Sequence, residues 1–176
     1  GMILPIVAYG DPVLKKMAIE IAADYPGLNA LIENMYESMY AAHGVGLAAP
    51  QIGKSIRLFI VDASGFVQED DEEYEALKDF KRTFINPVIL DEEGEEWAFE
   101  EGCLSIPDIR EDVFRQPDVT LRYLDENFVE HTEKFTGIAA RVIQHEYDHI
   151  EGVLFTDYLS PLKKRMLRKK LIRAMG

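Results

Sequence analysis

The chain has 176 residues, of which 47% are hydrophobic, and its formal net charge is −13 at pH 7. This length and composition suit one globular domain with a real hydrophobic core, so we expect a single domain over residues 1–176. No apolar stretch approaches about 18 residues, which excludes a membrane-spanning helix. The N-terminus lacks a basic region followed by a long apolar run, so no signal peptide is expected and the predicted compartment is cytoplasmic.

The first long periodic segment predicts an amphipathic helix over residues 28–43, which Gly44 ends. Its apolar residues at helical spacing are Leu28, Leu31, Ile32, Met35 and Met39. A loop of small residues follows at 44–53. In one interpretation Gly44 and Gly46 let the backbone approach a ligand closely while Gln51 presents its amide. In the other, the loop is only a helix-terminating turn with tight packing, and the loop by itself favours neither.

Four segments predict strands: residues 56–61, 83–90, 119–124 and 128–135. Pro87 interrupts the second segment, which predicts an edge strand. The last two flank Asp125-Glu126-Asn127, a predicted hairpin turn. Because the strands cluster between helical ends, the pattern favours an α+β fold with mostly antiparallel sheet over βαβ repeats.

Negative charge is concentrated in the middle of the chain. Residues 62–101 contain 15 acidic and 3 basic residues. Within this region, residues 64–82 are expected to form an acidic surface segment with a short helical piece. A solvated loop is the expected role of such a segment.

A histidine–glutamate pentad, residues 145–149, lies in a predicted helix over residues 137–151. Histidines four residues apart on a helix point to one side, so His145 and His149 can bind one metal ion, with Glu146 beside it to move a proton. The apolar positions of this helix include Ile138, Val142, Ile143 and Ile150. They surround much of the helix, as in a buried central helix.

Two imidazoles leave a catalytic metal site one protein ligand short. The pattern H-E-x-x-H-x-x-G-x-x-H fits at Gly152 but has Phe155 in place of its last histidine. After Asp157 the chain has no Asp, Glu or His, so the third ligand is expected upstream. Cys103, the only cysteine, cannot form an internal disulfide and is the candidate. A thiolate with two imidazoles suits zinc or ferrous iron, although most free cysteines are simply small buried hydrophobes.

The last helix is predicted over residues 161–174, in a region of 7 basic and no acidic residues from 158 to 176. Its basic residues are Lys163, Lys164, Arg165, Arg168, Lys169, Lys170 and Arg173, and its apolar positions include Leu162, Met166, Leu167 and Ile172. Such a helix can be solvated and favoured by its own dipole. It can also contact a nucleic-acid phosphate backbone.

Three blocks in this order resemble the motifs of peptide deformylase, G-x-G-x-A-A-x-Q, E-G-C-x-S and H-E-x-x-H. They are residues 44–51, 101–105 and 145–149. The opening residues 6–18 and the exit at 157–161 are also similar, so the resemblance covers nearly the whole chain. It implies antiparallel sheets around a central metal-bearing helix, with a further helix at the C-terminus.

The resemblance implies a role for each motif residue. Cys103, His145 and His149 would bind one divalent metal ion, and a metal-bound water would be the nucleophile. Glu146 would act as general base and then as general acid. The Gln51 amide and the Leu104 backbone N–H would stabilise the oxyanion. Family members typically use ferrous iron in the cell, while zinc, nickel or cobalt can occupy the same site.

The family removes the formyl group from the N-terminal formyl-methionine of nascent polypeptides and releases formate. The residues expected to contact the N-formylmethionyl peptide are Gly44, Val45, Gly46, Phe99, Arg110, Ile138 and Val142. Core packing is an equally ready explanation for the apolar ones. Arg141 precedes His145 by one helical turn, and its apolar stem could line the pocket while its charge reaches outward; the sequence leaves this open. By resemblance, the basic C-terminal helix could contact the ribosome near the exit tunnel.

Two other functions fit part of the pattern. One is a thiolate-ligated metallopeptidase that cuts internal peptide bonds, and the other is a non-enzymatic binding module, stabilised by a metal ion, whose basic helix binds RNA. A purely structural metal site needs no Glu inside the pentad and prefers four protein ligands. The glycine loop and Glu146 therefore argue against the binding module.

Overall fold

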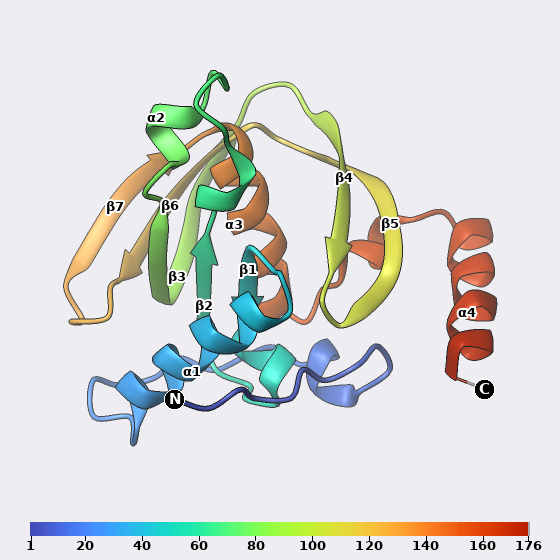
Figure 1. Ribbon diagram of the computed structural model, residues 1–176, viewed down its shortest axis with the longest axis horizontal. Helices are drawn as coiled ribbons and strands as arrows, with labels where there is room; N and C mark the ends of the chain where they lie inside the picture. The colour runs from blue at the N-terminus through green and yellow to red at the C-terminus, as the bar shows by residue number, and fades with distance from the viewer. Residues whose placement is uncertain (176) are drawn as a thin grey trace.

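The computed structural model describes residues 1–175, which form two antiparallel sheets with a helix between them (Figure 1). The larger sheet has the strand order β1-β2-β3-β6-β7. Its strands are β1 (Gly46–Ala48), β2 (Leu58–Asp62), β3 (Lys81–Glu93), β6 (Asp118–Leu124) and β7 (Glu130–Phe135). The smaller sheet is a hairpin of β4 (Trp97–Cys103) and β5 (Ile106–Arg115).

The helices are α1 (Leu28–Ala41), α2 (Tyr74–Leu77), α3 (Gly137–Ile150) and α4 (Pro161–Met175). Short 3-10 turns are η1 (Pro12–Lys15), η2 (Ala49–Ile52), η3 (Ser64–Phe66) and η4 (Phe155–Tyr158). The predicted α+β fold with antiparallel sheets around a central helix is confirmed. Within residues 1–175, no helix combines the length and the apolar character that crossing a bilayer requires.

Strand β2 shows why α3 is central. Successive side chains of a strand point to opposite faces of its sheet. Phe59 and Val61 pack in the core cluster that contains α3, whereas Leu58 and Ile60 pack in the cluster that contains α1. Both faces of the sheet are therefore covered at β2, and a run of four buried apolar residues results. In Figure 1, α3 lies between the large sheet and the β4–β5 hairpin.

The prediction that the strand containing Pro87 lies at an edge is wrong. β3 pairs with β2 on one side and with β6 on the other. Pro87 falls at an irregularity in the β3–β6 register between Ile85 and Val88. A proline cannot donate to the ladder, and a bulge is where a central strand tolerates one.

The predicted hairpin between the last two strands of the large sheet is present. The Asp125 carboxylate accepts hydrogen bonds from the backbone N–H groups of Asn127 (2.9 Å) and Val129 (3.1 Å). The β4–β5 hairpin, in contrast, was not among the predicted strands. Acidic residues occupy much of its sequence, and strand patterning based on apolar alternation does not detect it.

Residues 64–82 are mostly exposed, but they are anchored at both ends of α2. Leu77 and Phe80 are buried in the core cluster that contains α3. Glu73 reaches the start of α3, where its Oε1 accepts a hydrogen bond from the Ile138 N–H (3.2 Å). A carboxylate at a helix N-terminus satisfies a free N–H group and opposes the positive end of the helix dipole.

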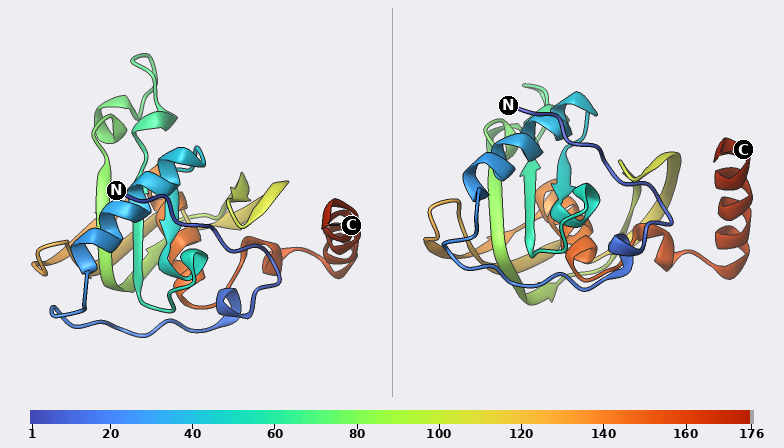
Figure 2. Two further views of the ribbon diagram at one scale, coloured as in Figure 1. Left: turned by 60° about the horizontal axis from the view of Figure 1, so that its bottom comes forward. Right: turned by 90° about the horizontal axis from the view of Figure 1, so that it is seen from below.

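Helix α4 lies at one side of the molecule, beyond β5 and away from the large sheet (Figures 1 and 2). Leu167 is buried in a third apolar cluster, which also contains residues of β5 and η4, and Leu171 packs against that cluster. Leu162, Met166 and Ile172 are exposed. Lys163 Nζ lies 3.4 Å from Glu111 Oε2 on the hairpin.

Candidate active site

Helix α3 supplies two candidate ligands and a carboxylate from one buried segment. His145, Glu146 and His149 are each at most 8% exposed, and the two imidazole ring centres lie 5.1 Å apart. The helix gives way at Gly152, which has φ +78°. A Cβ at this position would lie 2.7 Å from the Lys15 carbonyl oxygen, so both the turn and the packing require glycine.

Cys103, at the end of β4, lies beside these histidines although it is distant in sequence. Its Sγ is 3.4 Å from His149 Nε2. Cys103, His145 and His149 each offer a ligand atom, and these atoms all lie within 4.8 Å of one another. One thiolate and two imidazoles form a donor set suited to zinc or ferrous iron, and they leave room for a fourth ligand.

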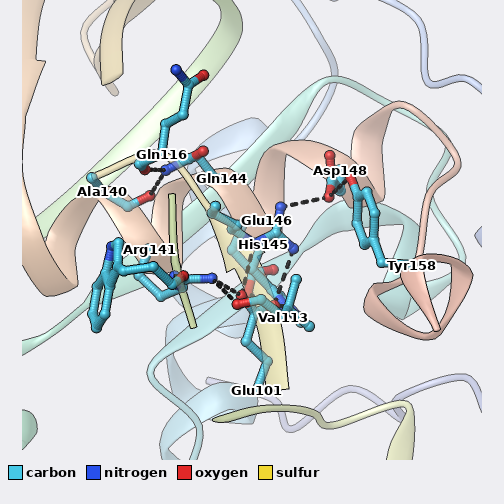
Figure 3. Close-up of polar contacts among 12 residues, drawn as sticks. Glu101, Val113, Gln116, Ala140, Arg141, Gln144, His145, Glu146, Asp148 and Tyr158 are labelled. Carbon is cyan, nitrogen blue, oxygen red and sulfur yellow. Dashed lines mark hydrogen bonds and ion pairs between the residues drawn. The ribbon is translucent and has the colours of Figure 1, made fainter. Parts of the chain in front are cut away.

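Glu101 orients the His145 ring through the nitrogen that is not available to the metal. Nδ1 of His145 donates to Glu101 Oε1 (2.8 Å), which leaves Nε2 of the ring for a metal (Figure 3). Arg115 binds the same carboxylate through two hydrogen bonds of 2.7 and 3.0 Å. Burial by itself raises the pKa of Glu101, but the hydrogen bonds from His145 and Arg115 outweigh it and lower the pKa to about 2. The ionised carboxylate can only accept, so Nδ1 carries the proton.

Glu146 lies on the cavity side of the site. Its Oε1 is buried without a hydrogen-bond partner, and burial raises the pKa of this carboxyl group to about 7. A Cβ on Gly46 would lie 2.6 Å from Glu146 Oε2, so only glycine lets β1 pass this close. The carboxyl group is therefore able to accept or release a proton near neutral pH.

Gln51 is held with its amide NH₂ group toward the cysteine. Its Oε1 accepts a hydrogen bond from the Ala48 N–H (3.0 Å). Its Nε2 lies 3.4 Å from Cys103 Sγ and donates to Ser105 Oγ (3.2 Å). Both ends of the amide are used, which fixes the direction in which it donates.

A cavity of about 560 Å³ opens beside the three candidate ligands. The predicted site residues that line it are Gly44, Val45, Gly46, Gln51, Phe99, Cys103, Leu104, Arg110, Val142, His145 and Glu146. Ile138 is not among the lining residues. It packs against the cluster of the large sheet, because it lies in the first turn of α3, two turns away from His145.

The cavity also involves residues that the sequence did not single out. Phe66, from the acidic segment, and Ile106, from β5, both line it. Glu101, which orients His145, was not predicted as a functional residue. Its place in the E-G-C-x-S block, two residues before Cys103, was the sequence feature that could have indicated this role. Arg141 lines the cavity, and its charge is turned to Glu101 rather than to solvent. At the cavity edge, the exposed Arg110 pairs with Glu100 (3.0 Å).

Comparisons with known proteins agree with this geometry. Residues 3–165 match the family described as Polypeptide deformylase. The peptide deformylase of Christiangramia forsetii is 62% identical over 173 residues, which cover 97% of this chain and 88% of the relative. A crystal structure of peptide deformylase from Ehrlichia chaffeensis in complex with actinonin has a TM-score of 0.88 at 33% identity, covering 99% of this chain and 98% of that one. A structure of a peptide deformylase from Legionella pneumophila has a TM-score of 0.85 at 39% identity, covering 98% and 95%. The chain belongs to the peptide deformylase family, whose metal-dependent members remove the N-formyl group from nascent polypeptides.

Proposed function

We propose that Cys103, His145 and His149 hold one divalent metal ion in this deformylase and that Glu146 transfers the protons of formamide hydrolysis. The observation that carries the proposal is the convergence of three donor atoms within 4.8 Å, beside a cavity that Glu146 also lines. When bound, the ion supplies a nucleophile near neutral pH, because it lowers the pKa of water to about 7 in favourable sites.

The side chains around the cavity divide the remaining work. Glu146, with its unpartnered Oε1, takes a proton from the attacking water and later delivers it to the leaving amine. The Gln51 amide and the Leu104 backbone N–H stabilise the negative charge that develops on the formyl oxygen. Losing one donor of this kind typically slows turnover about 10²–10³-fold.

The cavity walls take the N-formylmethionyl peptide. Val45 and Gly46 run along the substrate backbone, and Gly44 leaves room for the Leu104 side chain, which a Cβ at position 44 would approach to 2.6 Å. Phe99 and Val142 form the apolar pocket for the methionine side chain. Arg110, which pairs with Glu100 in the cavity lining, faces the bound peptide in this proposal.

A peptide assay tests the proposed activity. The metal-loaded protein is incubated with formyl-Met-Ala-Ser and with the same peptide lacking the formyl group, and formate and peptide products are measured. We expect formate from the formylated peptide alone. Internal cleavage would support a peptidase, and the absence of both products would support a binding module.

We propose ferrous iron as the metal in the cell, with zinc, nickel or cobalt as possible occupants after purification. A thiolate beside ferrous iron exposes both partners to oxidation. Activity should therefore fall on aerobic handling, and metal analysis of anaerobically purified protein should find iron. Activity that is insensitive to oxygen would argue for another native metal.

We also propose that residues 1–176 form one catalytic domain that works in the cytoplasm, where nascent chains emerge, with residues 64–82 as an acidic surface insertion. The basic helix α4 is the proposed contact with the ribosome near its exit tunnel. Its support is the run of seven basic residues on a helix that lies at one side of the molecule. Phosphate contacts of this kind weaken as salt increases.

A further inference from the structure

Arg141 is a buried cation on α3 for which the proposed reaction has no step. Its side chain is 2% exposed. Its Nη1 donates to Glu101 Oε2 (2.9 Å) and to the Val113 carbonyl (2.9 Å), and its Nη2 donates to the Trp97 carbonyl (2.6 Å). The rings of Trp97 and Phe99 lie 4.6 and 5.6 Å from its Cζ. One guanidinium thus binds both strands of the β4–β5 hairpin at once, as Figure 3 shows for Glu101 and Val113.

Apolar packing does not join the hairpin to α3 in the same way. The buried apolar residues of the hairpin, Ile106, Ile109 and Val113, belong to a cluster with η4 and α4. The buried apolar residues of α3 belong to the cluster of the large sheet. The two elements share no buried apolar cluster, so polar contacts join them. Besides those of Arg141, these include the Glu101–His145 hydrogen bond (2.8 Å) and the Arg115–Asp148 ion pair (2.8 Å).

This connection matters because the candidate ligands come from both elements. Cys103 and Glu101 are on the hairpin, whereas His145 and His149 are on α3. We propose that Arg141 is a positioning residue, which fastens the β4–β5 hairpin to α3 so that the Cys103 thiolate is held beside the two histidines. The inference rests on the proposed function, since it takes Cys103 to be a metal ligand.

The geometry indicates that Arg141 connects the hairpin to α3 and does not serve only to neutralise the charge of Glu101. Two of the three hydrogen bonds end on backbone carbonyls, one on each strand of the hairpin. Arg115 already gives Glu101 a bidentate partner. The planar guanidinium, packed against two aromatic rings, can satisfy three acceptors in fixed directions, which a lysine ammonium on a flexible stem cannot do.

The test measures metal retention. The cobalt-loaded protein is mixed with excess EDTA, and the loss of cobalt is followed by its visible absorption. We expect Arg141→Met to lose cobalt about 10–100-fold faster than the wild type, the usual effect of removing a residue that supports metal ligands. Arg141→Lys, which keeps the charge but not the fork, should fall between them. Its behaviour tests the proposal if Arg141→Met does not fold.

Arg57→Met is the matched control. Arg57 Nη1 donates to two carbonyls, of Ala18 (3.3 Å) and Ile150 (3.2 Å), and to the Glu151 carboxylate (3.0 Å), at the other end of α3. Its loss should lower the melting temperature while cobalt release stays within about twofold of the wild type. Hydrogen exchange of residues 97–115 in the loaded protein should accelerate in the Arg141 variants and not in Arg57→Met.

Four results would decide against the inference or its basis. Wild-type cobalt release and hairpin exchange in the Arg141 variants would overturn it. Equal acceleration in Arg57→Met would replace it with general destabilisation. Cys103→Ala distinguishes the proposed ligand set from the proposed role of Arg141. If this variant retains cobalt normally, the ligand set is wrong. If it loses cobalt while the Arg141 variants do not, only the positioning role of Arg141 is wrong.

Discussion

Helices α3 and α4 are nearly equal in length, with 14 and 15 residues, yet they have opposite surroundings. Ten residues of α3 are buried, and two of them, Arg141 and His145, donate to the Glu101 carboxylate. Glu146, in contrast, lines the cavity, and its Oε1 has no hydrogen-bond partner within residues 1–175. α4 carries basic side chains on a helix that touches the body through Leu167 and Leu171. Burial therefore separates the helix whose groups are oriented for chemistry from the helix whose charges remain available to a partner.

The largest expected effect is at the proton carrier of α3. Glu146→Ala should lower kcat by about 10²–10⁴-fold, because proton transfer in the transition state is lost. Metal content should stay near that of the wild type, since Glu146 is not among the three clustered donors. Formate release and metal analysis of the same preparation check both. An active, metal-replete variant would contradict the role given to Glu146.

Glu101→Gln should be the next most damaging change. A neutral amide leaves the buried Arg141 without its carboxylate and Arg115 with Asp148 alone (2.8 Å). Breaking a buried pair costs about 3–5 kcal/mol. We expect a lower free energy of unfolding and weaker metal retention. Denaturant unfolding measures the first and cobalt release the second. Glu100→Gln is the control: its pair with Arg110 is solvent-exposed, so its effect on stability should stay below about 1 kcal/mol.

Apolar substitutions test the same contrast without charge. Ile143→Ala removes a side chain that is 0% exposed in the central core and should cost about 2–5 kcal/mol in unfolding free energy. Ile172→Ala on α4 changes a side chain that is 68% exposed and should stay within about 0.5 kcal/mol. Comparable losses for the two variants would show that α4 is packed more tightly in solution than its contacts indicate.

The smallest effect on chemistry is expected when α4 is removed. A chain ending at Ser160 should keep its activity on short formyl peptides within about twofold, and the metal site should stay loaded, because the described part of α4 contains no candidate ligand or cavity residue. Its co-sedimentation with ribosomes should fall, and the co-sedimentation of the full chain should weaken as salt rises. Circular dichroism verifies folding, and unchanged co-sedimentation would contradict the ribosome contact.

Local patterns in the sequence determined much of this protein. Helical spacing indicated α3 and its paired histidines, and Asp125 indicated a hairpin turn. Because Cys103 is the only cysteine, it was the candidate for the third metal ligand. Such features depend on residues a few positions apart, so periodicity and turn chemistry are enough to find them. The three motifs, taken in their order along the chain, were enough to indicate the family.

Only the tertiary structure decided which distant groups meet. It placed β3 inside the sheet despite Pro87, left Ile138 outside the cavity, brought Phe66 to its rim and turned Arg141 toward the β4–β5 hairpin. These outcomes depend on contacts between residues far apart in the chain, such as the pairing of the buried Arg141 with Glu101, which no local period encodes. The same rule explains the two helices: one sequence supplies both, but only packing decides which charges are buried and oriented.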